Sequence, residues 1–269
     1  MTVTPAGSPA TPQIVAVTGA GSGIGLATAA AFAATGAAVV GLDLRDGPPM
    51  EGVTWLECDV ADNASVETAF ARIADVYGRL DVVVNNAGIG GRNTVETATD
   101  AEWLAVFEVN VFGVARVSRH AIPLLRQGNA ASIVNVASNV AVAGTPLRAV
   151  YSASKGAVAA LTRAMATDLV ADKIRVNAVY PGAVHTAVTG RYDADPDAAR
   201  ALLTARMPLG HLIDADEIAR AIVYLADPSN RSLTGAEFRY DGGVTELVNF
   251  GTAAPDTAGR IDQWQVSSR

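Results

Sequence analysis

The chain has 269 residues, half of them hydrophobic, which is enough for one large α/β domain. Its formal net charge of −7 and the lack of any lysine- or arginine-rich run argue against a nucleic-acid partner. The single cysteine, Cys58, excludes an intrachain disulfide and a metal site of the CxxC type.

The N-terminal residues 1–12 have neither a cationic start nor an apolar run, so we expect a flexible lead-in rather than a secretory signal. No apolar stretch of the sequence approaches the roughly 20 residues that a membrane span needs. The lone cysteine fits a reducing compartment. The sequence therefore predicts a soluble, cytoplasmic protein with no membrane partner.

From residue 14 onward, short hydrophobic runs alternate with longer alanine-rich segments. The hydrophobic runs are continuous rather than alternating, which is typical of parallel strands covered by helices on both faces. We predict a single-domain, doubly wound Rossmann-like α/β fold with a mostly parallel seven-stranded sheet. Strands are expected at 14–18, 38–43, 53–58, 80–85, 132–137, 174–180 and 237–240, helices at 24–35, 64–77, 100–127, 150–170 and 214–226, and a polar, flexible stretch at 185–207.

A glycine-rich turn, TGAGSGIG at 18–25, joins the first strand to the first helix. Glycines leave room for a phosphate to approach the backbone, and the unpaired N–H groups and dipole of the following helix favour an anion. About twenty residues on, Asp43 ends the second strand, where a carboxylate can accept hydrogen bonds from ribose hydroxyls and repel a 2′-phosphate. Ser22 and Leu44 bring no compensating positive charge, so the pair predicts NAD, with NADP less favoured although Arg45 is near.

A second constellation begins at Tyr151, which shares a helix face with Lys155 four residues later. An unperturbed phenol has a pKa of about 10, so a tyrosine that acts as an acid or base near neutrality needs a nearby cation, which Lys155 supplies. Ser138 ends a strand at the sheet edge where such folds bind ligands, and its hydroxyl can hold a substrate oxygen.

These motifs resemble those of the classical short-chain dehydrogenase/reductase family. The resemblance runs from about residue 14 to 244 through TGAGSGIG (18–25), the Asp59-Val60 pair, NNAG (85–88), Asn110, Ser138, YSASK (151–155) and the Pro181-Gly182 pair, in the family's order. It implies hydride transfer between a nicotinamide cofactor and a secondary alcohol or ketone, and it requires no metal. We assign residues 13–247 to this domain.

The resemblance also implies a role for each matched residue. Tyr151 would be the general acid/base and Ser138 would orient the reacting oxygen, while Lys155 would lower the tyrosine pKa and bind the nicotinamide ribose. Asn110 would hold a water in the proton relay, and all four are the expected catalytic residues. The cofactor-binding residues would be Gly19, Gly21, Ser22, Gly23, Ile24, Gly25, Asp43, Leu44, Asp59, Val60, Asn86, Ala87, Gly88, Tyr151, Lys155, Pro181, Gly182, Val184 and Thr186.

The substrate pocket is expected to have an apolar wall together with groups that can bind a polar or acidic substituent. Its residues come from the loop after Ser138, the stretch before Tyr151 and the segment after Gly182. The expected substrate-facing residues are Ser138, Val140, Leu147, Arg148, Tyr151, His185 and Val188, with Asn139 beside them.

Two other functions remain open. One is an NADPH-dependent carbonyl reductase of the 3-oxoacyl type, against which Asp43 counts. The other is a nicotinamide-binding regulatory protein without turnover.

Assembly is expected as well. The segment 150–170 is apolar on more than one face, which with the family resemblance predicts a homotetramer. The tail, residues 248–269, carries Val248, Phe250, Ile261 and Trp264, and we expect it to dock on a neighbouring subunit.

Overall fold

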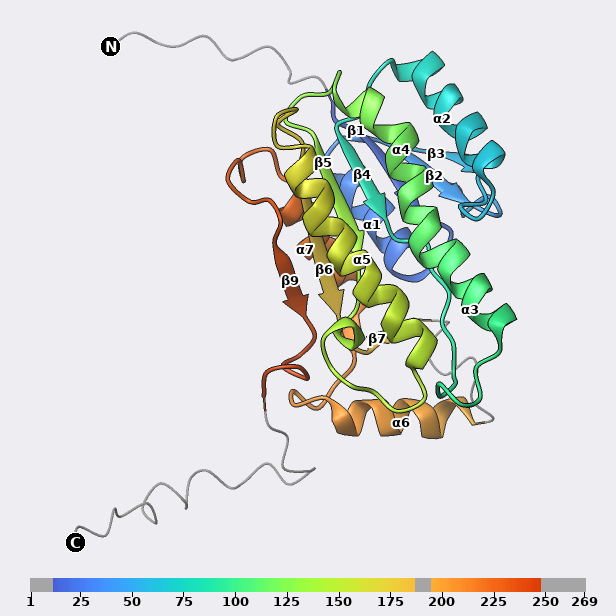
Figure 1. Ribbon diagram of the computed structural model, residues 1–269. Helices are drawn as coiled ribbons and strands as arrows, with labels where there is room; N and C mark the ends of the chain where they lie inside the picture. The colour runs from blue at the N-terminus through green and yellow to red at the C-terminus, as the bar shows by residue number, and fades with distance from the viewer. Residues whose placement is uncertain (1–11, 187–194, 248–269) are drawn as a thin grey trace, which may run out of the picture.

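A parallel sheet forms the centre of the molecule (Figure 1) in a computed structural model that describes residues 12–186 and 195–247. Its seven strands are ordered β3-β2-β1-β4-β5-β6-β9, and every neighbouring pair is parallel. The predicted doubly wound fold is therefore confirmed. The strands are β1 (Ile14–Thr18), β2 (Ala38–Asp43), β3 (Val53–Glu57), β4 (Val82–Asn85), β5 (Ser132–Val136), β6 (Arg175–Pro181) and β9 (Glu237–Tyr240).

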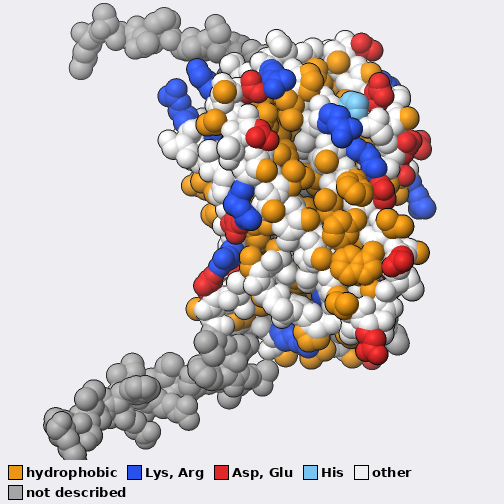
Figure 2. All heavy atoms as spheres, viewed as in Figure 1, with side chains coloured by type: hydrophobic (Ala, Val, Ile, Leu, Met, Phe, Trp, Pro, Cys, Tyr) orange, Lys and Arg blue, Asp and Glu red, His pale blue; other side chains and the backbone are white. Residues whose placement is uncertain are grey.

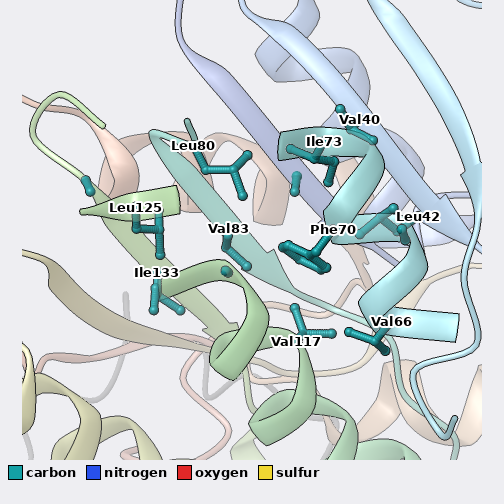
Figure 3. Packing of buried hydrophobic residues seen from close by; sticks show 14 of the residues in the cluster. Val40, Leu42, Val66, Phe70, Ile73, Leu80, Val83, Val117, Leu125 and Ile133 are labelled. Carbon is teal, nitrogen blue, oxygen red and sulfur yellow. The ribbon is translucent and has the colours of Figure 1, made fainter. Parts of the chain in front are cut away.

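Helices cover both faces of the sheet because the central strands carry buried side chains in both directions; every residue of β1, β4, β5 and β6 is buried. On one face lie α2 (Asn63–Tyr77), α4 (Gly113–Leu125) and α5 (Ala149–Asp168). Figure 3 shows this packing, with Phe70 and Ile73 of α2 and Val117 of α4 among the strand residues Val83 and Leu42. The opposite face is covered by α1 (Gly23–Ala34) and α7 (Ala215–Ala226), which pack against each other.

Strand order reverses between β1 and β4, because the chain builds outward from β1 through β2 to β3 and then returns to add β4 on the other side. Ligands bind at such a switch point, outside the carboxyl ends of the strands. Because all seven strands are parallel, their carboxyl ends share one edge of the sheet. In Figure 1 the arrowheads of β6 and β9 point toward α6 (Pro196–Arg206).

Helix α6 corrects the expectation that residues 185–207 form a flexible stretch. The Asp195 side chain accepts hydrogen bonds from the N–H groups of Asp197 and Ala198 at 3.1 and 3.0 Å, and Pro196 occupies the first turn. Both features favour a helix start. Two short strands, β7 (Val184–His185) and β8 (Ile213–Asp214), precede and follow this helix in the chain and pair with each other.

The expected helical stretch at 100–127 contains a change of helix type. Helix α3 (Asp100–Phe107) begins with a capping box between Thr99 and Glu102, and it continues into a π-helical turn, η1 (Glu108–Phe112), before α4. Such turns widen a helix and are frequent at functional sites. Asn110 lies on this turn.

Within residues 12–186 and 195–247, no helix combines the length and the apolar character needed to cross a membrane. The same residues contain no group of three or more His, Cys, Asp or Glu side chains placed to hold a metal ion. The predicted lead-in, apart from Pro12, and the predicted docking tail lie outside the described residues, as does Val188.

Candidate active site

A cavity of about 860 Å³ opens at the carboxyl edge of the sheet, within the range of small-molecule sites. It is lined by the loops that follow β1 to β6 and by α6. Most of the residues expected from the sequence line this one cavity: Gly19, Ser22, Gly23, Ile24, Asp43, Leu44, Asp59, Val60, Asn86, Ala87, Gly88, Ser138, Val140, Arg148, Tyr151, Lys155, Pro181, Gly182, Val184 and Thr186.

The glycine loop is packed so closely that side chains are excluded at Gly19 and Gly25. Gly19 has a φ of +62°, and a Cβ there would lie 2.8 Å from the Cα of Ala87. A Cβ on Gly25 would lie only 2.1 Å from the carbonyl oxygen of Gly19. The Asn86 amide braces the turn by donating to the carbonyl oxygens of Thr18 and Gly19 at 2.9 and 3.1 Å.

This loop fits the pyrophosphate of a dinucleotide. Ser22 precedes α1 and makes no side-chain capping hydrogen bond, so the first N–H groups of the helix remain available to an anion. Gly21 and Gly25 shape the turn without lining the cavity.

Asp43 faces the same loop from the end of β2. Its carboxylate accepts a hydrogen bond from the Gly21 N–H at 2.8 Å, and a Cβ on Gly21 would lie 3.0 Å from that carboxyl group. Leu44 is exposed and lines the cavity beside it, whereas Arg45 is exposed and lies outside the lining. The carboxylate is therefore the charged group that faces the cavity at this end of β2.

Ser138, Tyr151 and Lys155 converge at the other end of the cavity. Ser138 lies just beyond β5, and its hydroxyl donates to the Asn139 amide oxygen at 3.3 Å. Tyr151 and Lys155 lie in the first turns of α5, with the lysine Nζ 5.8 Å from the centroid of the tyrosine ring. The Lys155 ammonium is buried and donates to the carbonyl oxygen of Val136 at 2.7 Å. A phenol, a hydroxyl and an ammonium group thus lie at the same end of the cavity.

Burial has the largest effect on the pKa values of Tyr151 and Lys155. Burial raises the pKa of Tyr151, while a hydrogen bond with Ser138 and the positive charge of Arg148 both lower it. Burial lowers the pKa of Lys155 to about 8. The sequence predicted Lys155 as the cation that acts on the tyrosine, whereas the structure adds Arg148, three residues before it.

Asn110 is buried beneath the cavity and does not line it. Its amide oxygen accepts from the Ile89 N–H at 2.8 Å, and its amide nitrogen donates to the Ile89 carbonyl at 2.9 Å and the Ser154 hydroxyl at 3.0 Å. A Cβ on Gly88 would lie 3.2 Å from the Asn110 amide oxygen and 3.5 Å from the Lys155 Nζ. The Asn110 side chain therefore ties the loop after β4 to α5.

The substrate end differs from the sequence expectation in part. Val140 and Arg148 line the cavity, but Leu147 and the exposed His185 do not. Lining residues that the sequence reasoning missed include Ile89, Arg92, Val244, the α6 residues Leu203 and Arg206, and Met207 just after that helix. The Asp195-Pro196 pair before an alanine- and leucine-rich run was the signal for α6.

Comparison with known proteins identifies the family of the chain. A family model described as enoyl-(acyl carrier protein) reductase matches residues 19–245. A cis-4-hydroxycyclohexanecarboxylate dehydrogenase from Sinomonas cyclohexanicum is 38% identical over 245 residues, covering 87% of this chain and 97% of the relative.

Two solved structures share the fold. The ligand-free aldohexose dehydrogenase of Thermoplasma acidophilum superposes with a TM-score of 0.84 at 31% identity, covering 90% of this chain and 97% of that chain. A 3-ketoacyl-(acyl-carrier-protein) reductase from Brucella melitensis, complexed with NADH, gives a TM-score of 0.79 at 32% identity, covering 87% of this chain and 98% of that one.

Proposed function

The chain belongs to the short-chain dehydrogenase/reductase family of oxidoreductases that use a nicotinamide cofactor, and from this premise we propose that it interconverts a secondary alcohol and a ketone with NAD(H). The observation that carries the proposal is that one cavity joins the glycine loop and Asp43 to Ser138, Tyr151 and Lys155. A bound nicotinamide supplies the hydride acceptor or donor. The chain supplies the proton chemistry and the orientation.

Tyr151 is the general acid/base of this proposal. Its hydroxyl gives a proton to the oxygen of a ketone, or its phenolate takes one from an alcohol. Because burial raises its pKa, the phenolate depends on the Ser138 hydrogen bond, on Arg148 and on the nearby Lys155 ammonium for stabilisation. Ser138 also positions the reacting oxygen, and Asn110 is a positioning residue that acts through Ile89 and Ser154.

Asp43 supports NAD rather than NADP. A carboxylate at this position accepts hydrogen bonds from ribose hydroxyls and repels a 2′-phosphate. Arg45, the nearest cation in sequence, is exposed and lies outside the cavity lining. A ratio of kcat/KM with NAD⁺ to that with NADP⁺ well above one is the expected result.

The test is a substrate panel followed by NADH absorbance. It includes cis-4-hydroxycyclohexanecarboxylate, an aldohexose and simple secondary alcohols with NAD⁺ or NADP⁺, and a 3-oxoacyl thioester with the reduced cofactors. We expect NAD⁺-linked oxidation of at least one alcohol. A 3-oxoacyl thioester reduced only with NADPH supports the second candidate function. The similarity to a 3-ketoacyl-(acyl-carrier-protein) reductase favours that substrate class but not NADPH, because that structure holds NADH. NADH binding without any turnover supports a regulatory protein.

We also propose a homotetramer that works in the cytoplasm. Hydrophobic side chains gather on the face formed by α3, α4 and α5 (Figure 2), where Leu104 and Phe112 are 63% and 46% exposed. The outward side of α5 carries the exposed small residues Ala153, Ala160 and Ala164, which allow close helix packing between identical subunits.

A further inference from the structure

Charge is divided unequally along the cavity. The acidic residues in its described lining, Asp43 and Asp59, lie at the end of β2 and just after β3, on the side of the glycine loop. The described residues that line the rest of the cavity include Arg92, Arg148 and Arg206 but no carboxylate. A cationic substrate end in a chain with a net charge of −7 requires an explanation.

Arg148 lies at the start of α5, beside the reacting group. One guanidinium nitrogen donates to the Gly91 carbonyl oxygen at 2.9 Å, which fixes the side chain between the loop after β4 and the helix. A guanidinium has five N–H donors, so this bond leaves most of its capacity unused. No carboxylate in the described residues forms an ion pair with it.

Arg206 reaches the cavity from a different element, the last turn of α6. It is exposed, and it too lacks an ion-pair partner among residues 12–186 and 195–247. Leu203 and Met207 of the same segment also line the cavity. The substrate end thus combines an apolar wall with two guanidinium groups.

We propose that the substrate is a hydroxy acid or keto acid whose carboxylate binds Arg148 and Arg206 while its hydroxyl or carbonyl faces Tyr151. This inference rests on the proposed function for the position of the reacting carbon. Guanidinium groups suit carboxylates because two parallel N–H donors match two oxygens, and such charge-assisted bonds are stronger than neutral ones. The apolar residues of α6 contact the carbon skeleton between the two polar ends.

The first test compares matched substrates that differ only in charge. 3-Hydroxybutyrate is paired with 3-hydroxybutyramide, and 3-hydroxycyclohexanecarboxylate with its carboxamide, each with NAD⁺. We expect kcat/KM for at least one acid to exceed that of its amide by about tenfold or more. Arg206→Gln should reduce this ratio about tenfold. Arg72→Gln, which removes an exposed charge on α2 outside the cavity, should leave the ratio unchanged. Equal rates for acid and amide overturn the inference and leave the proposed function intact.

The second test measures binding without turnover. Calorimetry on the full-length protein saturated with NADH compares cyclohexanecarboxylate with cyclohexanecarboxamide. Tighter binding of the acid, lost in Arg206→Gln and weakened by salt, supports the anion site even if no alcohol is oxidised. Equal binding of the two compounds overturns it. Failure of the reaction and failure of the anion site are thereby distinguished.

Discussion

The two ends of the cavity are built differently, and we expect them to recognise their ligands by different means. At the β1–β3 end, recognition depends on the backbone: Gly19 and Gly25 are packed so closely that no side chain fits, and one carboxylate, Asp43, faces the loop. At the β4–β6 end, it depends on side chains from several elements, among them Tyr151 of α5 and Arg206 of α6. A backbone cradle fixes a ligand common to many enzymes, whereas side chains adapt to one substrate.

The largest expected effect is a loss of turnover caused by a change at the β4–β6 end. Tyr151→Phe removes only the hydroxyl, so kcat should fall about 10²- to 10⁴-fold while the NADH dissociation constant stays within about twofold. Initial rates and NADH fluorescence titration measure the two quantities. Retained turnover would refute the role of Tyr151 as acid/base.

Gly25→Ala should damage the backbone end. The added Cβ would lie 2.1 Å from the Gly19 carbonyl oxygen, so the loop must open. Overpacking costs about 1–3 kcal/mol, which predicts NADH binding about 10- to 100-fold weaker. Gly156→Ala is the matched control, because a Cβ in that helical position meets only the Ala141 carbonyl oxygen, at 3.9 Å. Unchanged NADH affinity in Gly25→Ala would show that the cradle is not the binding element.

Asp43→Ala tests the single side chain on which the backbone end depends. Hydrogen bonds to a charged group contribute about 1.5–3 kcal/mol, so the preference for NAD over NADP should fall about 10- to 100-fold. Asp46→Ala removes an exposed carboxylate outside the cavity lining and should leave the preference intact. The readout is kcat/KM with each cofactor, and an unaltered ratio in Asp43→Ala contradicts the assignment.

A smaller effect concerns the pH dependence of NADH affinity, which we expect to involve Lys155. With a pKa of about 8, the buried Lys155 loses its positive charge as the pH rises from 7 to 9. If the ammonium binds the nicotinamide ribose, NADH affinity should weaken over this range, since only the protonated form is the favourable partner. Lys155→Met should bind NADH more weakly at pH 7 and show no such pH dependence. A wild-type affinity that is flat from pH 7 to 9 would argue against the ribose contact.

The smallest effect on the cavity itself is expected from Ala160→Glu, on the outward side of α5. A charge on that face should dissociate the proposed tetramer, as measured by light scattering, because a desolvated carboxylate without a partner is costly. Ala71→Glu on α2, also an exposed helical alanine, serves as the control. A wild-type protein whose mass in solution is that of one chain would contradict the proposed tetramer.

The same contrast explains what the sequence predicted. The cradle occupies one short stretch, and both its glycines and Asp43 are visible as local pattern. Tyr151 and Lys155 are visible because one helix turn separates them. Arg206 was missed because its helix lies in a polar stretch, where composition favours a loop over the capping signal of Asp195 and Pro196.

The hydrogen bonds that hold the Asn110 side chain likewise join residues that are far apart in the chain. Its partners Ile89 and Ser154 lie far from it in the chain, and the π-helical turn that carries it has no marker among the residues 108–112. The positive charge that acts on Tyr151 is a similar case. The sequence predicts Arg148 as a substrate-binding residue, but its effect on the pKa of the Tyr151 phenol depends on the folded arrangement around α5.

The pairing of β7 with β8 has a consequence for how such a protein diversifies. Val184 pairs with Ile213 and His185 with Asp214, so the two ends of the excursion that carries α6 are joined to each other beside the sheet. An insertion whose ends are held together can change in length and composition at little cost to the rest of the domain. Substrate range can therefore drift through this excursion while the cofactor cradle stays unchanged. For the same reason, we expect that exchanging residues 195–212 between relatives changes substrate preference more than cofactor affinity.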